Sequence, residues 1–472
     1  MFIIDIIVNI LSTPAILVGL LAMLGLVLQG KPTSAIIKGT IKTIAGFVVL
    51  GAGASYLLSG SLNDFGTLFN FAFKMQGVVP NNEAIVSQAL TQYGQATALI
   101  MCFGMVANIV LARFSRMKYI FLTGHHTLYM ACMIAVILSV GGLSGIPLII
   151  GGSALLGLVM VISPALLQPS MEKITGSKDL AFGHFGGFGY FVSAQVGKLF
   201  KGSKSSEDIN FPKGLSFLRD TTVSISITMI VFFMIVTGVA VMNGGLSDPT
   251  ISALFAGGDT KTHWLVWALM HGINFAAGVY IILSGVRLII GEIVPAFKGI
   301  AEKLVPNSKP ALDCPVVFPY APNAVLIGFL VSFAGGIVGL LVLGMINTNL
   351  IPVALILPGV IPHFFCGASA GVFGNAQGGL KGCIAGSFAH GLLITFLPAI
   401  CMPVMGALQF ANTTFSDADF SVVGILIGNV AQYVQGYGLL AICLVLFALP
   451  IVYNLVAPKK VNKEADEKAY SK

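Results

Sequence analysis

Five ionisable side chains lie in segments that are otherwise apolar or rich in glycine. They are His125 and His126 in "FLTGHHTLYM", His184 in "LAFGHFGGFGYF", Asp313 in "KPALDCPVVFPYAPNAVLIGFL" and Glu83 in "VVPNNEAIVSQAL". A neutral histidine donates and accepts hydrogen bonds, whereas a carboxylate only accepts them. This combination suits a small polyhydroxylated ligand better than a metal ion or a hydrocarbon, because each hydroxyl of such a ligand both donates and accepts.

The contexts of these residues support a binding role to different degrees. His125 and His184 each follow a glycine, which lets the backbone approach a ligand closely, and a functional role is favoured for both. Asp313 is either a ligand-binding carboxylate or an interfacial one paired with Lys309, four residues earlier. For Glu83 the favoured interpretation is a solvated acid at a loop tip, and binding is the alternative.

The remaining histidines are weighed in the same way. His126 is interpreted first as a cap or anchor at the membrane interface and second as a ligand group. His363 lies between a proline and a glycine-rich segment, so function and packing are equally supported. His263, His271 and His390 lack such a context and are predicted to be structural.

The composition indicates a membrane protein. Of the 472 residues, 56% are hydrophobic and 9% charged, whereas an average soluble domain has about 25% charged residues. Stretches such as 221–242 and 439–457 have the roughly 20 apolar residues that cross a bilayer. The net charge of +7 is explained by the basic residues that orient such a chain, so a nucleic-acid partner is not predicted.

Apolar windows predict about eleven transmembrane helices, near residues 6–29, 43–59, 92–112, 119–141, 145–168, 221–243, 264–290, 322–346, 351–373, 383–405 and 430–457. The segment 351–373 is equally consistent with a re-entrant loop. Basic residues gather in alternate connections, which places the N-terminus outside and the C-terminus in the cytoplasm. The loops 60–80, 142–144, 244–260 and 406–420 then lie outside, and the last of them contains Asp417 and Asp419.

Four segments are too polar or broken to cross the membrane alone and are predicted to be re-entrant: 77–95, 177–196, 309–321 and 359–380. Irregular backbone at membrane depth must be buried in protein or line a wet cavity, and transporters build substrate sites there.

A faint internal repeat supports this plan. Residues 35–46 match 280–291, Tyr93 and 98–100 match Tyr320 and 325–327, and His125 matches His363. The matches predict an inverted repeat of about five spans, the architecture of many secondary transporters. In this looser alignment Glu83 is the counterpart of Asp313.

Motifs for covalent chemistry are missing from the sequence. It contains no hydrolase elbow, phosphate loop or metal-binding helix motif, and its seven cysteines form no CxxC pair. No catalytic residue, cofactor or metal is therefore predicted.

Several motifs together resemble a known family. "LTGHH" at 122–126, "FGHFG" at 182–186, "LDCPVVFPYAPNAVLIGF" at 312–329 and "PGVIPHFFCGASAGVFGN" at 358–375, with "IIKGTIKTIAGF" at 36–47, resemble the ascorbate-type IIC permeases of the bacterial phosphoenolpyruvate-dependent sugar phosphotransferase system. The related galactitol-type branch is an alternative.

The resemblance implies an all-α polytopic protein of the bacterial cytoplasmic (inner) membrane. It implies a homodimer in which a V-shaped scaffold supports a mobile core that moves like an elevator. The divisions would be 1–76 and 220–305 (scaffold), 77–219 and 306–420 (core), 421–457 (last transmembrane helix) and 458–472 (cytoplasmic tail).

The resemblance also implies a substrate site. Its contacts would be His125, Tyr129, His184, Phe185 and Asp313, and more loosely Asn82 and Glu83. Family members associated with ascorbate carry glutamine where this chain has Tyr129 and Phe185, which leaves open whether the substrate is L-ascorbate or a similar sugar acid or polyol.

The implied partners are separate IIB and IIA proteins, because no phosphoryl-carrying cysteine loop of the IIB type occurs in this chain. Cys314 is disfavoured as a phosphoryl carrier, since Asp313 and apolar surroundings oppose its thiolate. An ion-coupled symporter using Asp313 is the rival hypothesis. A membrane scaffold or sensor without transport is a third.

Overall fold

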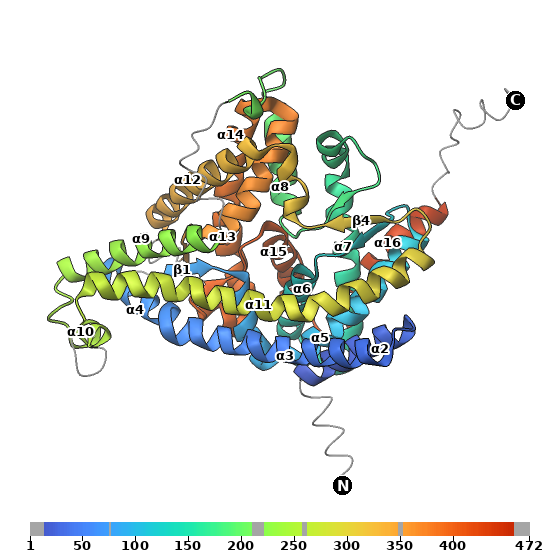
Figure 1. Ribbon diagram of the computed structural model, residues 1–472, viewed down its shortest axis with the longest axis horizontal. Helices are drawn as coiled ribbons and strands as arrows, with labels where there is room; N and C mark the ends of the chain where they lie inside the picture. Colours follow the sequence, from blue (N-terminus) through green and yellow to red (C-terminus); the bar gives the residue numbers. More distant parts are fainter. Residues whose placement is uncertain (1–13, 75–76, 210–220, 257–261, 348–352, 457–472) are drawn as a thin grey trace, which may run out of the picture.

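The computed structural model describes residues 14–74, 77–209, 221–256, 262–347 and 353–456 (Figure 1). The helices are α2 (Pro14–Leu28), α3 (Thr33–Leu57), α4 (Asn63–Phe73), α5 (Asn82–Phe114), α6 (Gly124–Val140), α7 (Gly145–Thr175), α8 (Gly187–Lys198), α9 (Thr221–Met242), α10 (Pro249–Phe255), α11 (Trp264–Leu304), α12 (Pro322–Ile346), α13 (Val360–Pro362), α14 (Ala368–Cys401), α15 (Ala418–Tyr433) and α16 (Tyr437–Val456). Two π-helical turns, Leu58–Leu62 and His363–Gly367, join α3 to α4 and α13 to α14.

The helices confirm an all-α polytopic membrane protein. Within the described residues, eight helical stretches are long and apolar enough to cross a membrane. The predicted number of about eleven differs for two reasons. The helices at the expected spans 6–29 and 119–141 are α2 and α6, whose 15 and 17 residues are too few to be counted, and two other expected spans merge. The span predicted at 383–405 and the C-terminal part of 351–373 form one helical stretch, His363–Val404, with a kink at Gly378 and Gly379.

Two more boundaries differ from prediction. The segment 77–95, predicted to be re-entrant, forms strand 77–80 and the first turns of α5, where the Asn81 side chain caps the helix by accepting a hydrogen bond from the Ala84 backbone at 2.7 Å. The predicted last span, 430–457, divides between α15 and α16.

Two small parallel sheets connect the halves of the chain. The strands are β1 (Gly77–Pro80), β2 (Tyr119–Phe121), β3 (Ala181–Phe182), β4 (Lys309–Leu312), β5 (Leu355–Ile356) and β6 (Thr413–Thr414). Their orders are β5-β1-β6 and β2-β4-β3. The first strand of each half therefore lies between the second and third strands of the other half, as two copies of one unit would arrange them.

The strand pairing gives a register for the repeat that differs from the sequence matches. Gly77 pairs with Leu355 in one sheet, and Lys309 pairs with Tyr119 in the other. The strands 77–80 and 309–312 then correspond, which makes Asn81 the counterpart of Asp313. Both residues follow their strand directly and use the side chain to cap the next helical turn, so Glu83 is not the counterpart.

Helix packing places one short helix at the centre. Residues 128–138 of α6 are all almost completely buried, and α6 lies behind α11 in Figure 1. α3 and α11 run side by side across the same view. α12 packs closely on α14, where Gly328 faces Gly371 and a Cβ on either residue would meet backbone of the other helix.

Candidate functional site

The polar side chains that the sequence singles out gather where the strands of both sheets end. Glu83 follows β1, His125 and His126 follow β2, His184 follows β3 and Asp313 follows β4. They surround a cavity of about 810 Å³. Its walls also include residues of α9 and α11: Thr222, Ile225, Ala276, Val279, Tyr280 and Arg287.

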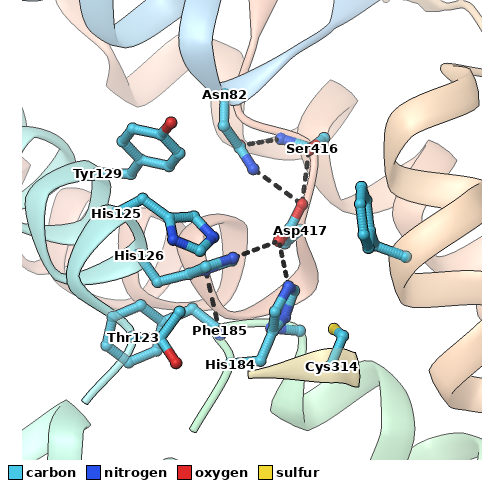
Figure 2. A network of polar contacts seen from close by, with 12 residues as sticks. Asn82, Thr123, His125, His126, Tyr129, His184, Phe185, Cys314, Ser416 and Asp417 are labelled. Atoms are coloured by element: carbon cyan, nitrogen blue, oxygen red, sulfur yellow. Dashed lines mark hydrogen bonds and ion pairs between the residues drawn. The ribbon is translucent and has the colours of Figure 1, made fainter. Parts of the chain in front are cut away.

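Asp417 is at the centre of the cluster (Figure 2). Its Oδ2 lies 3.7 Å from His126 Nε2 and 3.8 Å from His184 Nε2. Its Oδ1 accepts hydrogen bonds from Asn82 Nδ2 at 2.9 Å and from the Ser416 hydroxyl at 2.6 Å. The Asp417 side chain is therefore held by one oxygen while the other faces the two histidines.

The hydrogen bonds of the histidines define their tautomers. His126 Nδ1 accepts from the Phe185 backbone at 3.3 Å, and His184 Nδ1 accepts from the Gly186 backbone at 3.1 Å. A ring nitrogen that accepts carries no proton, so the proton of each neutral ring is on Nε2 and points toward Asp417. Burial lowers the pKa of His184, although Asp417 and Asp313 oppose this effect, and the lowered pKa favours the neutral ring.

Asp313 lies at a more open part of the same cluster. Its Oδ2 is 3.5 Å from His125 Nε2, its Oδ1 is 3.9 Å from His184 Nε2, and its side chain is 37% exposed. Lys309 instead approaches Glu172, at 3.9 Å. Of the two interpretations of Asp313, the structure supports a carboxylate in the cavity wall rather than an ion pair with Lys309.

Glu83 is buried in the cavity wall, so the favoured interpretation as a solvated loop-tip acid is wrong. Its side chain is 6% exposed. Glu83 Oε1 accepts a hydrogen bond from the Tyr129 hydroxyl at 3.4 Å. Tyr129 and Asn82 also line the cavity.

Phe185 has a different place. Its side chain is fully buried, stacks on Phe121 at 4.4 Å between ring centroids, and is not part of the cavity wall. Its backbone supports the site instead, since its nitrogen donates to His126 and its carbonyl accepts from the Asp419 backbone at 2.8 Å. A direct contact between the Phe185 side chain and a substrate remains a prediction that this arrangement does not support.

Sequence reasoning missed two residues of the site. Asp417 and Asp419 are buried, although segment 406–420 is predicted to be an outer loop. Asp419 accepts from the Phe188 backbone at 2.6 Å and from the Ser163 hydroxyl at 2.7 Å, and so holds the start of α8 beside His184. The N-cap pattern "SDAD" before an apolar helix was the available signal. His126, interpreted first as an interfacial cap, belongs to the buried cluster as well.

The cluster also has the residue types of a metal site. Three groups of side chains each bring their possible ligand atoms within 4.8 Å of one another. One of these groups is His126, His184 and Asp417. A histidine that binds a metal through Nε2 carries its proton on Nδ1 and donates it to an acceptor. Here both Nδ1 atoms face backbone N–H donors, so these rings direct N–H groups rather than lone pairs toward Asp417.

The other histidines lie outside this cavity. Ser332 Oγ lies 2.8 Å from His363 Nδ1 and 3.0 Å from His390 Nδ1, all in the packed interior. His271 pairs with Asp64 on α4 at 3.2 Å. Of the two interpretations of His363, packing is the one that the structure supports.

A helical membrane fold with a polar cavity at strand ends and helix starts defines a class of membrane transport protein. Comparison with known proteins narrows the class. The family model for the PTS system sugar-specific permease component matches residues 9–419. The chain belongs to this family of phosphotransferase-system permeases.

One curated relative is the ascorbate-specific PTS system EIIC component of Mycoplasma pneumoniae (strain ATCC 29342 / M129 / Subtype 1). It is 27% identical to this chain over 422 residues, which is 80% of this chain. The matched region spans 63% of the relative's length.

Proposed function

We propose that the protein is a IIC permease that binds L-ascorbate, or a similar small sugar acid or polyol, and carries it across the bacterial cytoplasmic membrane for phosphorylation by a separate IIB protein. The observation that carries this proposal is the cavity in which Asp313, Asp417 and three histidines meet from both halves of the chain. The family membership and the ascorbate-specific relative support it.

The polar groups suit a ring or chain that bears several hydroxyls. Asp313 and Asp417 accept hydrogen bonds, while the Nε2–H groups of His126 and His184 donate them. A carbonyl or enolate oxygen bound near the histidines would place neighbouring hydroxyls against the carboxylates. No group in this arrangement forms a covalent bond with the substrate, so phosphoryl transfer belongs to the partner.

The walls of the cavity support an elevator movement. One wall comes from segments 77–219 and 306–420, whose strands are interleaved in two sheets and so move together. The other wall comes from α9 and α11, within the proposed scaffold 220–305. Sliding of the first body along the second would carry the substrate from one membrane face to the other.

The same proposal covers the remaining segments of the chain and its oligomeric state. Residues 1–76 complete the scaffold, 421–457 contain the last transmembrane helix and 458–472 are a cytoplasmic tail. The functional unit is a homodimer, with the N-terminus outside and the C-terminus in the cytoplasm, and IIA supplies the phosphoryl group to IIB.

Proteoliposomes provide the test. With phosphorylated IIB inside, we expect radiolabelled L-ascorbate to accumulate as a phosphate ester; galactitol and common hexitols are compared in parallel. Asp313→Asn should reduce accumulation, whereas Asp179→Asn, at an exposed acid away from the cavity, should not. Concentrative uptake of unmodified substrate that follows an ion gradient would instead establish the rival, a symporter.

A further inference from the structure

One oxygen in the cavity wall has no partner. Glu83 Oε2 is buried and forms no hydrogen bond with any described residue, although the side chain lines the cavity. A buried polar atom of this kind is rare in folded proteins and requires an explanation.

The groups around Glu83 compensate a negative charge only in part: a backbone N–H at the start of α5 and the Tyr129 hydroxyl favour the carboxylate, but no cation among the described residues pairs with it. Tyr129 from α6 places its hydroxyl 3.4 Å from Oε1. Asp417, before α15, contributes a second carboxylate close enough to act on Glu83 electrostatically. No described lysine, arginine or histidine forms an ion pair with Glu83.

The other charged groups of the cavity either interact with residues other than Glu83 or form no ion pair with it. Asp313 interacts with His125 and His184, and His126 interacts with Asp417. Among the described residues that line the cavity, Arg287 on α11 is the only lysine or arginine. It is exposed and is not within ion-pair distance of Glu83.

A buried carboxylate without a cation or a full set of donors is energetically costly, and a second carboxylate beside it adds repulsion. A protonated carboxyl group avoids both costs and gains a donor. We propose that Glu83 is a neutral carboxylic acid that donates a hydrogen bond from Oε2 to an acceptor oxygen of the substrate.

This inference rests on the proposed function for its substrate and adds a specificity rule. Asp313 and Asp417 bind hydroxyl groups, whereas the Glu83 acid binds an oxygen that only accepts, such as a carbonyl, an enolate or a carboxylate. A polyol satisfies the carboxylates, but only a sugar acid or lactone also offers Glu83 a strong acceptor. The site therefore favours oxidised sugars over reduced ones.

Infrared spectroscopy of the substrate-free protein tests whether the Glu83 carboxyl group is protonated. The difference spectrum between the wild-type protein and Glu83→Gln at neutral pH should contain the carbonyl stretch of a protonated carboxylic acid, and this band should disappear from the wild type at high pH. Glu172→Gln, at a partly exposed acid, should not remove the band. A wild-type spectrum without it would overturn the inference, even if Glu83→Gln did not fold.

Binding of radiolabelled L-ascorbate to the purified full chain tests the donor. Glu83→Gln keeps an N–H donor and should bind within a few-fold of wild type at every pH, while Glu83→Ala should bind about tenfold more weakly. Wild-type affinity should fall with rising pH, and that of Glu83→Gln should not. Equal losses in the two variants would contradict a donor role.

The two proposals fail separately in these experiments. If Glu83 is protonated but the protein binds neither ascorbate nor galactitol, the proposed function is wrong and the protonation of Glu83 is supported. If the protein binds ascorbate but its infrared spectrum lacks the carboxylic acid band, the proposed function is supported and the protonation of Glu83 is wrong.

Discussion

Two clusters of histidines in this protein have similar compositions but different surroundings. In the first, His126 and His184 face the carboxylate of Asp417 in a cavity. In the second, His363 and His390 face the hydroxyl of Ser332 between packed helices, and a Cβ on Gly336 would collide with His363. The hydroxyl oxygen lies within hydrogen-bond distance of both Nδ1 atoms, so the second cluster uses both of these atoms within the protein.

The difference shows what turns buried histidines into a binding site. Asp417 Oδ2 lies 3.7 and 3.8 Å from the two Nε2 atoms, too far for hydrogen bonds, so both N–H groups can still donate to a ligand. Ser332 Oγ lies 2.8 and 3.0 Å from the Nδ1 atoms of its two rings, and neither ring lines the cavity of the first cluster. We therefore expect the first cluster to control affinity and the second to control stability.

The largest expected effect is that of Asp417→Asn. The amide would turn N–H groups toward either the two histidines or its donors Asn82 and Ser416, so we expect substrate affinity to fall about 100-fold. Equilibrium binding measures it, with size-exclusion chromatography to confirm folding and Asp179→Asn as the control. Affinity within twofold of wild type would place Asp417 outside the site.

Ser332→Ala should have the opposite profile. It removes the partner of two buried ring nitrogens, and we expect the free energy of unfolding to fall by about 1–3 kcal/mol with substrate affinity unchanged. Thermal unfolding in detergent and binding at a temperature where the variant is folded separate the two quantities. Ser59→Ala, at an exposed serine on α3's π-helical extension, is the control. A stable variant with weakened binding would contradict the distinction between the clusters.

Asp313→Asn should weaken substrate binding about tenfold, less than the change at Asp417, because Asp313 is 37% exposed and its interactions are partly screened. The variant should remain in the membrane at the wild-type level, which immunoblotting of membrane fractions measures. Disappearance from the membrane would show that the carboxylate is structural.

The smallest effect should come from the pair of Asp64 and His271 on α4 and α11. Both ring nitrogens of His271 face acceptors, the Trp267 carbonyl at 2.9 Å and Asp64 Oδ2 at 3.2 Å. This pair is partly exposed, and Asp64→Asn should cost about 1 kcal/mol or less and leave binding unchanged. A loss of affinity would show that the proposed scaffold contributes to the site electrostatically.

Much of the fold could be predicted because its signals are local. Long apolar windows predict α9 and α12 close to their observed bounds. Gly378 and Gly379 are a local signal too, since their backbone is non-helical and kinks α14 where Gly378 packs against the Gly197 backbone. The prediction was less accurate where the ends of a span depend on tertiary neighbours, as at 430–457, which divides between α15 and α16.

The site shows the same limit. Gly-His contexts identify His125 and His184, and the resemblance adds Asp313, Asn82 and Tyr129, all of which line the cavity. Hydropathy assigns Asp417 to an outer loop, because the composition of a polar segment is the same whether water or two imidazole rings surround its acidic side chain. Phe185 occupies a family contact position, but its side chain is packed on Phe121.

By itself the sequence determined the membrane class, the family and most residue types of the cavity, since hydrophobicity and short motifs are properties of neighbouring residues. Tertiary structure alone decided that Asn81 corresponds to Asp313, that Asp417 joins His126 to His184, and that Glu83 is buried without a cation. These relations arise because strands far apart in the chain alternate in two parallel sheets, and no local pattern specifies which strand ends will meet.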